Sequence, residues 1–302
     1  RVGELQNTHP VIATTDVCSR FGLSACPENL RLGNVSFTFT SMEILIRDSA
    51  EIGCILGAKI IARVVREKPD AVLGLATGRT PLRLYQELIR LHRDEGLDFS
   101  RVTTFNLDEY IGLAGTHDQS YRYFMRENFF RHINIDPQRT HVPDGTAANL
   151  HAECRGYEQR ILDAGGIDIQ LLGLGRNGHI GFNEPTGSLR SRTWIKILSE
   201  QTLRDNSAVF GSFDAMPKHA LTMGIGTILD ARRCLLLAFG PAKVRAVEHM
   251  VEGPLAAICP GSALQLHPRA TVILDENSSA GLHYADHYRW IDSQKLDWQR
   301  NG

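Results

Sequence analysis

The chain has 302 residues, 42% of them hydrophobic, so it can bury a large core as one domain or as two smaller ones. Its 33 Lys and Arg residues nearly cancel its 34 Asp and Glu residues, which excludes a global field that recruits nucleic acid or an anionic membrane but leaves a local basic pocket open. No apolar run approaches the ~18 residues of a membrane span, and the polar start lacks the apolar core of a signal peptide. We therefore expect a cytoplasmic protein with a small-molecule partner.

The cysteines carry no metal or disulfide pattern. They are scattered without a CxxC pair or a Cys/His cluster, which argues against a zinc site and against a disulfide framework. We predict reduced thiols and no metal. Cys54 and Cys234 lie inside apolar periodic segments, where a free Cys behaves as a small buried hydrophobe.

The N-terminal region gives the first predicted elements. Residues 1–33 show little periodicity and several breakers, so we expect an irregular extension before one domain over residues 34–302. The alternation from Asn34 to Phe39 predicts a strand. Ser41 is expected to cap a long helix that runs to about Arg66.

Strands and helices then alternate along the chain. Strands are predicted at 71–76, 101–106, 167–172, 193–198, 233–239 and 270–274, and helices at 81–92, 120–132, 150–164 and 242–251. This pattern predicts an α/β fold with a single doubly wound, mostly parallel sheet that has helices on both faces, as in Rossmann-like proteins. Ligands of such sheets bind at the carboxyl ends of the strands, so the loops that follow the strands should carry the site.

The segment 171–185, LLGLGRNGHIGFNEP, is the strongest candidate loop. An apolar run gives way to Gly175, Gly178 and Gly181 at a spacing of three, and glycine lets backbone approach a ligand closely. The loop also holds His179, which can exchange a proton near neutral pH, and Glu184, which could fix its tautomer and stabilise its charge. The alternative is a strand-exit turn with a solvated His.

A second loop is suited to an anion. Thr77, Gly78, Arg79 and Thr80 lie between a predicted strand and a helix start, where free backbone N–H groups and the helix dipole favour a phosphate. The segment matches neither the Walker A motif nor the dinucleotide turn, which disfavours nucleotide binding. Lys243 follows another strand and could add charge at the same edge. Taken singly, each feature is also compatible with an ordinary helix start.

A third loop offers a candidate base. Asp108 and Glu109 are adjacent at a strand end, and neighbouring side chains of an extended segment point apart, so only one can face the pocket. A buried carboxylate there could abstract a proton from carbon if burial raises its pKa. The alternative is a solvated acidic turn.

Six motifs in order give the chain a resemblance to a known family. They are LGLATGRTPLRLY (73–85), TFNLDEYIGL (104–113), SYRYFMRENFF (120–130), GLGRNGHIGFNEP (173–185), HALTMGIGTILDA (219–231) and QLHPRATVILDE (265–276). With them the chain resembles the glucosamine-6-phosphate deaminases, in the family that also contains the 6-phosphogluconolactonases. DEYIGL and GHIGFNEP separate it from the lactonases, whose comparable segments usually read DER and GHTASLFP.

The resemblance implies a cofactor-free reaction in amino-sugar catabolism that converts glucosamine 6-phosphate and water to fructose 6-phosphate and ammonia. His179, with Glu184, would move the proton that opens the sugar ring. Asp108 would transfer a proton between C2 and C1. The substrate would be held by the Thr77–Thr80 loop, Gly175 and Lys243.

Departures from the family pattern concern three positions. Asn177 stands where the enterobacterial type has Asp, and we expect it to hydrogen-bond the imidazole without stabilising its charge. Ala208 stands where many relatives have a phosphate-binding Arg, and we hypothesise that Arg79 compensates; the alternative is that Arg79 faces solvent. Trp194 replaces the Arg that, with the Lys matching Lys196, binds the activator N-acetylglucosamine 6-phosphate in hexameric members.

The third departure does not favour allosteric activation or a hexamer, although a homo-oligomer stays open. Three rival functions also stay open: a galactosamine-6-phosphate deaminase, a 6-phosphogluconolactonase, and a sugar-phosphate sensor without catalysis. The presence of Asp108, His179 and Glu184 argues against the sensor.

Overall fold

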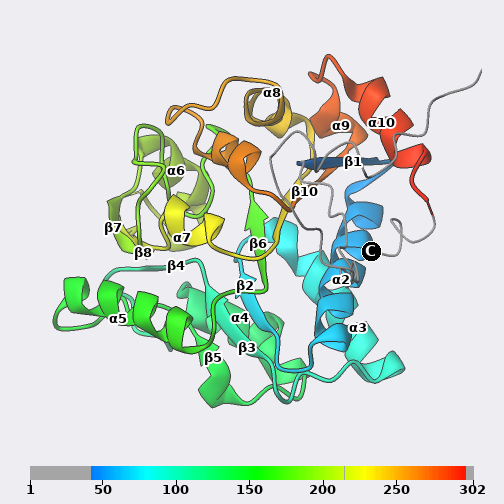
Figure 1. Ribbon diagram of the computed structural model, residues 1–302. Coiled ribbons are helices and arrows are strands. Elements are labelled where there is room, and N and C mark those ends of the chain that lie inside the picture. Colours follow the sequence, from blue (N-terminus) through cyan, green and yellow to red (C-terminus); the bar gives the residue numbers. More distant parts are fainter. Residues whose placement is uncertain (1–41, 214, 297–302) are drawn as a thin grey trace, which may run out of the picture. The chain divides into compact units, whose positions relative to one another are not determined.

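Seven parallel strands form the central sheet (Figure 1). The structure is a computed structural model that describes residues 42–213 and 215–296, with the backbone alone at 205, 206, 208 and 209. The predicted extension 1–33, the strand Asn34–Phe39 and Ser41 lie outside these residues. The strands of the sheet are β1 (Glu43–Arg47), β2 (Val72–Leu75), β3 (Thr103–Asn106), β5 (Thr140–His141), β6 (Ile169–Gly173), β9 (Cys234–Ala238) and β10 (Ala270–Asp275). Their order is β1-β10-β9-β6-β2-β3-β5.

Helices connect these strands. They are α2 (Ala50–Glu67), α3 (Arg79–Glu95), α4 (Tyr121–Asn128), α5 (Leu150–Asp163), α6 (Glu200–Asn206), α7 (Ile225–Leu229), α8 (Val244–Val251), α9 (Glu276–Ser279) and α10 (Ala285–Ser293). Short 3-10 turns are η1 (Phe130–His132), η2 (Pro137–Arg139), η3 (Ser207–Phe210), η4 (Pro241–Lys243) and η5 (Pro260–Leu266).

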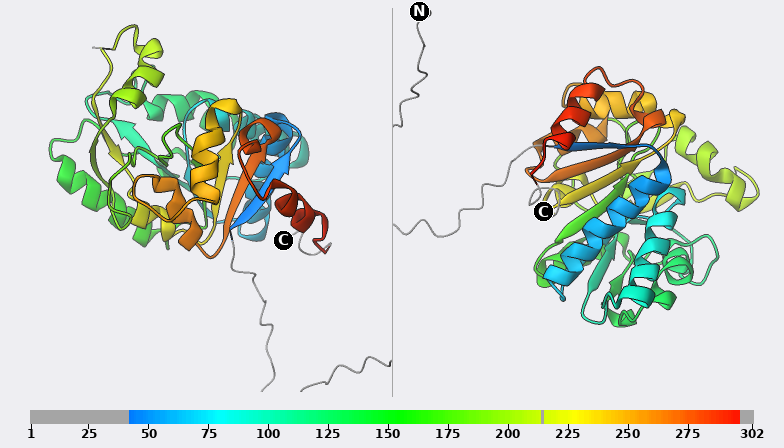
Figure 2. Two further views of the ribbon diagram at one scale, coloured as in Figure 1. Left: turned by 90° about the horizontal axis from the view of Figure 1, so that it is seen from above. Right: turned by 90° about the vertical axis from the view of Figure 1, so that its right-hand side faces the viewer.

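The direction of the chain across the sheet decides which face each helix covers. From β1 to β2, β3 and β5 the chain moves toward one edge, and from β5 through β6, β9 and β10 it moves back. Because parallel crossovers are right-handed, α2, α3 and α4 cover one face and α5, α7 and α8 the other. Figure 2 shows α2 and α3 side by side on their face. The predicted doubly wound sheet is confirmed, and its winding reverses between β2 and β6.

The predicted start of the first helix is wrong. Residues Glu43–Arg47 are a strand, and α2 begins only at Ala50, where the Ser49 hydroxyl accepts a hydrogen bond from the Ile52 N–H at 3.3 Å. Three consecutive apolar residues, 44 to 46, are all buried in β1. Such a run is typical of a strand buried on both faces, and reading it with helical spacing joined two elements.

The start of α3 also differs from the prediction. The helix begins at Arg79 rather than Pro81, because Gly78 is its N-cap with φ of 106°, a conformation that glycine adopts without strain. Arg79 and Thr80 therefore belong to the first helical turn and not to the loop.

A second, antiparallel sheet was not predicted. It consists of β4 (Asp108–Tyr110), β8 (His219–Thr222) and β7 (Trp194–Ile197) in the order β4-β8-β7. The predicted strand at 193–198 exists as β7, but in this smaller sheet. Strands of three and four residues are too short to show a clear alternation of polar and apolar residues. They become recognisable only from their pairing in the structure.

The last helix packs at the edge of the central sheet. Arg47 at the end of β1 forms an ion pair of 2.8 Å with Asp292 of α10, and Lys295 forms one of 2.7 Å with Glu43. Figure 1 shows α10 beside β1, at the sheet edge opposite β5.

None of the helices within residues 42–213 and 215–296 combines the length and the apolar composition that a membrane span requires. Cys54, Cys154, Cys234 and Cys259 are free and buried, as predicted for Cys54 and Cys234.

Candidate functional site

The candidate site lies where the winding of the sheet reverses. β2 and β6 are neighbours there, pairing Leu73 with Ile169 and Gly74 with Gln170. Their carboxyl ends lead into the Thr77–Thr80 segment and the loop 174–184, one to each face of the sheet. Diverging loops at such a switch point leave a crevice, which is the usual ligand position in open α/β sheets.

The loop after β6 folds around the imidazole of His179. Gly175 N–H donates to the His179 carbonyl at 2.8 Å, and Gly178 N–H donates to the Gly175 carbonyl at 3.0 Å, which closes a tight turn. A Cβ placed on Gly175 would lie 2.3 Å from Cε1 of His179. Any side chain at Gly175 would therefore displace the ring, so this glycine makes room for the predicted proton-transfer group.

Glu184 joins this loop to α6. Its carboxylate accepts hydrogen bonds from Asn177 Nδ2 at 2.7 Å, from Ser199 Oγ at 3.0 Å, and from Thr202 Oγ1. His179 Nδ1 lies 3.5 Å from Glu184 Oε2 and makes no closer hydrogen bond to any described residue. Burial raises the pKa of Glu184, but His179 and the donors from Thr202 and Asn177 together lower it to about 2.

Asn177 acts differently from the prediction. Its Oδ1 accepts a hydrogen bond from the backbone N–H of His179 at 3.3 Å, while its Nδ2 donates to Glu184. The expected hydrogen bond to the imidazole is thus replaced by one to the backbone, because the short Asn side chain closes a local turn. Asn177 thus ties the backbone of His179 to the carboxylate of Glu184.

The side chain of Asp108 is buried beside the glycine loop. Asp108 pairs with Thr222 in the small sheet, and a Cβ built on Gly181 would lie 3.6 Å from its Oδ2, so the carboxyl group borders the glycine loop. No described residue donates a hydrogen bond to its side chain. Burial and, next, the charge of Glu109 raise the pKa of Asp108 to about 8.

Glu109 points the other way, as the alternation of an extended segment predicts. It is 2% exposed and accepts hydrogen bonds from the backbone N–H groups of Tyr110 and Tyr121 at 2.9 Å and of Arg122 at 3.0 Å. Burial raises its pKa, and the N–H donors and Arg122 oppose that shift. Glu109 therefore caps α4 and fixes β4 directly behind Asp108, a role that sequence reasoning missed.

The Thr77–Thr80 segment has an open helix start. No side chain caps α3 at Gly78, so its first N–H groups are available to an anion. The side chain of Thr77 interacts with the hydroxyl of Tyr121, which donates to Tyr110 at 3.2 Å. This chain of contacts links the segment to the strand that carries Asp108.

Lys243 comes from the turn between β9 and α8. Gly240 in that turn has φ of 85° and donates its N–H to the Asp275 carboxylate at 3.0 Å. Asp275 also caps α9 by accepting from Ser278 N–H at 2.8 Å. This carboxylate, which the sequence did not single out, fixes the turn that carries Lys243.

Trp194 and Asn183 link the loop after β6 to the small sheet. The Trp194 Nε1–H donates to Asn183 Oδ1 at 3.1 Å, and Asn183 Nδ2 donates to the Met223 carbonyl at 2.7 Å. The Lys196 ammonium lies 4.9 Å from the centroid of the Trp194 ring.

The side chain of Ala208 lies outside the described part of the chain. Within residues 42–213 and 215–296 no group of three or more His, Cys, Asp or Glu could hold a metal ion.

Comparison with known proteins identifies the family. The model of the family "Glucosamine-6-phosphate isomerases/6-phosphogluconolactonase" matches residues 53–273, so the chain belongs to this family of α/β sugar-phosphate enzymes. A glucosamine-6-phosphate deaminase of Hahella chejuensis (strain KCTC 2396) is 53% identical over 255 residues, which are 84% of this chain and 97% of that protein. One of Arthrobacter sp. (strain FB24) is 52% identical over 256 residues, 85% of this chain and 98% of that protein.

Solved structures agree with this assignment. A monomeric glucosamine-6-phosphate deaminase matches with a TM-score of 0.78 and 49% identity over 80% of this chain and 100% of that one. A 6-phosphogluconolactonase from Leishmania guyanensis shares the fold, with a TM-score of 0.64 at 20% identity over 80% of this chain and 98% of that one. The resemblance found in the sequence motifs is confirmed.

Replacing Glu109 by Gln tests the electrostatic part of this geometry. The Glu109→Gln variant keeps an acceptor oxygen for α4 but removes the charge that helps raise the pKa of Asp108. We expect the acid limb of the pH profile of kcat/KM, which reports groups of the free enzyme, to move to lower pH. The exposed Glu67→Gln variant, at the end of α2 and before the amino end of β2, is the control and should leave the profile in place. An acid limb that stays fixed or moves to higher pH in Glu109→Gln would contradict the geometry.

Proposed function

We propose that the chain is a glucosamine-6-phosphate deaminase, which converts glucosamine 6-phosphate and water to fructose 6-phosphate and ammonia. The observation that carries the proposal is the pair of carboxylates with opposite environments. Asp108 is buried, accepts no hydrogen bond from the described residues and has a raised pKa, whereas Glu184 is held ionised beside His179. Two carboxyl groups whose pKa values are pushed apart suit a reaction that needs a proton carrier and a fixed negative charge. Relatives of about half identical sequence carry the same activity in their names.

Asp108 is the proposed base for the isomerisation. Its pKa of about 8 lies near a neutral operating pH, where a general base works best. The substrate's ammonium group, placed near this carboxyl group, would favour the ionised form and lower the pKa further. Asp108 then takes the proton from C2 and returns it at C1, and water hydrolyses the resulting imine to release ammonia.

His179 is the proposed group for ring opening. Its ring rests against Gly175, with Nδ1 facing the ionised Glu184. A carboxylate on that side favours the tautomer with the proton on Nδ1 and stabilises the ring when it is charged. Nε2 is then the nitrogen that accepts and donates the substrate's proton.

The phosphate is proposed to bind at the start of α3. The supporting features are its uncapped N-terminus, the hydroxyl of Thr80, and the positive charge of Arg79. Arg79 is exposed and has no ion pair within the described ranges. Lys243, in the turn that follows β9, would add a second positive charge at the carboxyl ends of the strands, and Gly175 leaves room for the His179 ring. Binding energy at the phosphate would position C1 and C2 against Asp108 and His179.

Control by N-acetylglucosamine 6-phosphate is not part of the proposal. The indole of Trp194 donates to Asn183, and Lys196 rests against the face of the same ring. These contacts occupy the two positions that the activator would need. The cytoplasmic location, the lack of a cofactor and a homo-oligomer stay predictions.

Ammonia release from glucosamine 6-phosphate by the purified protein is the direct test of the function. In the Asp108→Asn variant, which keeps the shape but cannot accept the proton, release should fall by about 10²–10⁴-fold. The exposed Asp118→Asn is the matched control and should retain full activity. Unchanged release from Asp108→Asn would refute the assigned base, and no release from the wild type would refute the function.

A stability measurement shows whether the Asp108→Asn variant is folded. The raised folded-state pKa of Asp108 means that its ionised form opposes folding, and this cost appears as pH rises from about 4 to about 8. Relative to the wild type, the melting temperature of Asp108→Asn should therefore be higher at about pH 9 than at about pH 5. Lost activity together with this gain excludes unfolding as the cause.

Arg79→Ala tests the phosphate subsite. Loss of a charge-assisted contact to phosphate should raise KM about tenfold or more, with little change in kcat, because the contact exists in both the ground and transition states. The control is Arg83→Ala, one turn along α3, where Arg83 is paired with Glu51. If KM of Arg79→Ala equals that of the wild type, Arg79 does not compensate for the Arg that Ala208 replaces.

A further inference from the structure

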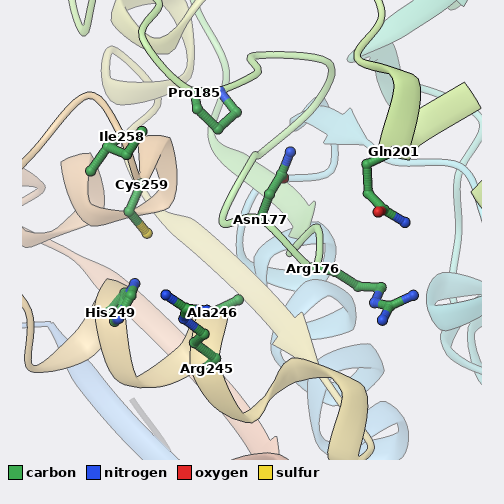
Figure 3. A pocket seen from close by; sticks show the side chains of 9 residues that line it. All are labelled: Arg176, Asn177, Pro185, Gln201, Arg245, Ala246, His249, Ile258 and Cys259. Carbon is green, nitrogen blue, oxygen red and sulfur yellow. The ribbon is translucent and has the colours of Figure 1, made fainter.

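A second hollow opens beside the catalytic loop, toward α8. Its volume is about 420 Å³, within the range of small-molecule sites. Figure 3 shows side chains that line it from the loop after β6, from α6, from α8, and from the segment before η5. The lining residues are Arg176, Asn177, Pro185, Gln201, Arg245, Ala246, His249, Ile258 and Cys259. Neither Asp108 nor His179 is among them, nor is any residue of the Thr77–Thr80 segment.

The lining is cationic on one side. Arg176 and Arg245 carry positive charge, His249 adds an imidazole that can donate a hydrogen bond, and none of the described residues that line the hollow is Asp or Glu. Arg245 and His249 are four residues apart on α8 and so share a face of the helix. Neither side chain has an ion pair or hydrogen bond to another described residue. The neighbouring carboxylate of Glu248 faces elsewhere, since a Cβ on Gly281 would lie 3.5 Å from it.

The opposite side of the hollow is apolar. Pro185 and Ile258 line it, and Ile258 is 64% exposed, which leaves a large aliphatic side chain for a ligand to cover. Guanidinium groups present paired donors that match phosphate oxygens. A ligand with a phosphate group and a short carbon skeleton satisfies both sides.

We propose that this hollow binds a small phosphate monoester at a site separate from the phosphate subsite of the substrate. Its wall includes Asn177, which donates to Glu184 at 2.7 Å, and Gln201 of α6. Two other residues of the α6 segment, Ser199 and Thr202, also donate to Glu184. A bound ester would therefore bridge the two elements that Glu184 holds together. Any effect on turnover rests on the proposed function, whereas binding itself does not.

Calorimetric titration with glycerol 3-phosphate tests the site. The titration uses the 302-residue chain with Lys243→Ala, in which the proposed substrate-phosphate subsite is weakened. We expect that this variant binds the ester, and that adding Arg245→Ala and His249→Ala weakens binding about tenfold or more, because charge-assisted hydrogen bonds to phosphate are lost. Since the readout is not ammonia release, failure of this site and failure of the proposed function are distinguishable.

A matched control comes from α5. His151 and Arg155 are exposed, lie at the same spacing, and are the same two residue types, so His151→Ala with Arg155→Ala in the Lys243→Ala background should leave the affinity unchanged. No binding to Lys243→Ala, or binding that survives loss of Arg245 and His249, would overturn the site. A parallel titration with inorganic phosphate should give at least about threefold weaker binding, because it lacks the carbon skeleton that covers Ile258. Equal affinity would overturn the assignment to an ester.

Discussion

The ionised carboxylate of Glu184 is the constraint on which the rest of the site depends. One oxygen accepts from Asn177 in the loop after β6, and the other accepts from Ser199 and Thr202 at the start of α6. These segments follow strands of two different sheets, so a single buried group sets their relative position. The same group faces Nδ1 of His179. Burial of a charge is unfavourable unless donors compensate for lost water, and here three side-chain donors do so while fixing the imidazole.

At Asp108 burial has the opposite outcome, because it raises the pKa and favours the neutral carboxyl group. Its carboxyl group, at the first residue of β4, is buried beside the glycine loop, and no described side chain donates a hydrogen bond to it. Glu109, the next residue, faces away and accepts hydrogen bonds from three backbone N–H groups, so it supports β4 while Asp108 stays available for the proposed proton transfer. The small antiparallel sheet makes this division possible, because its alternation sends the two side chains to opposite faces. It also pairs Asp108 with Thr222, whose hydroxyl accepts from the Phe182 N–H at 3.1 Å.

The sequence predicted those parts of the protein that depend on local pattern. The buried strands β2, β6, β9 and β10 and the glycine loop could be read from apolar runs and spacing, as could Asp108, His179 and Glu184 as candidates. The small sheet could not, because it pairs β4 with β8, which lies over a hundred residues further along the chain. The cap that Glu109 provides could not either, because it depends on how the start of α4, 12 and 13 residues further on, packs against β4. The helix predicted from Ser41 failed because the apolar residues of β1 also fit a helical period. Asn177 was identified, but its partner was not, since a short amide can reach several groups within one turn.

The most direct test of the account is a titration of the two carboxyl groups in the ligand-free protein, by NMR of samples labelled with ¹³C at Asp and Glu side-chain carboxyls. Asp108→Asn and Glu184→Gln variants assign the signals. We expect Asp108 to titrate with a pKa of about 8 and Glu184 with a pKa of about 2. If both titrate together near the ordinary value of about 4, burial does not separate the two groups, and the proposed division between a proton carrier and a fixed charge is wrong.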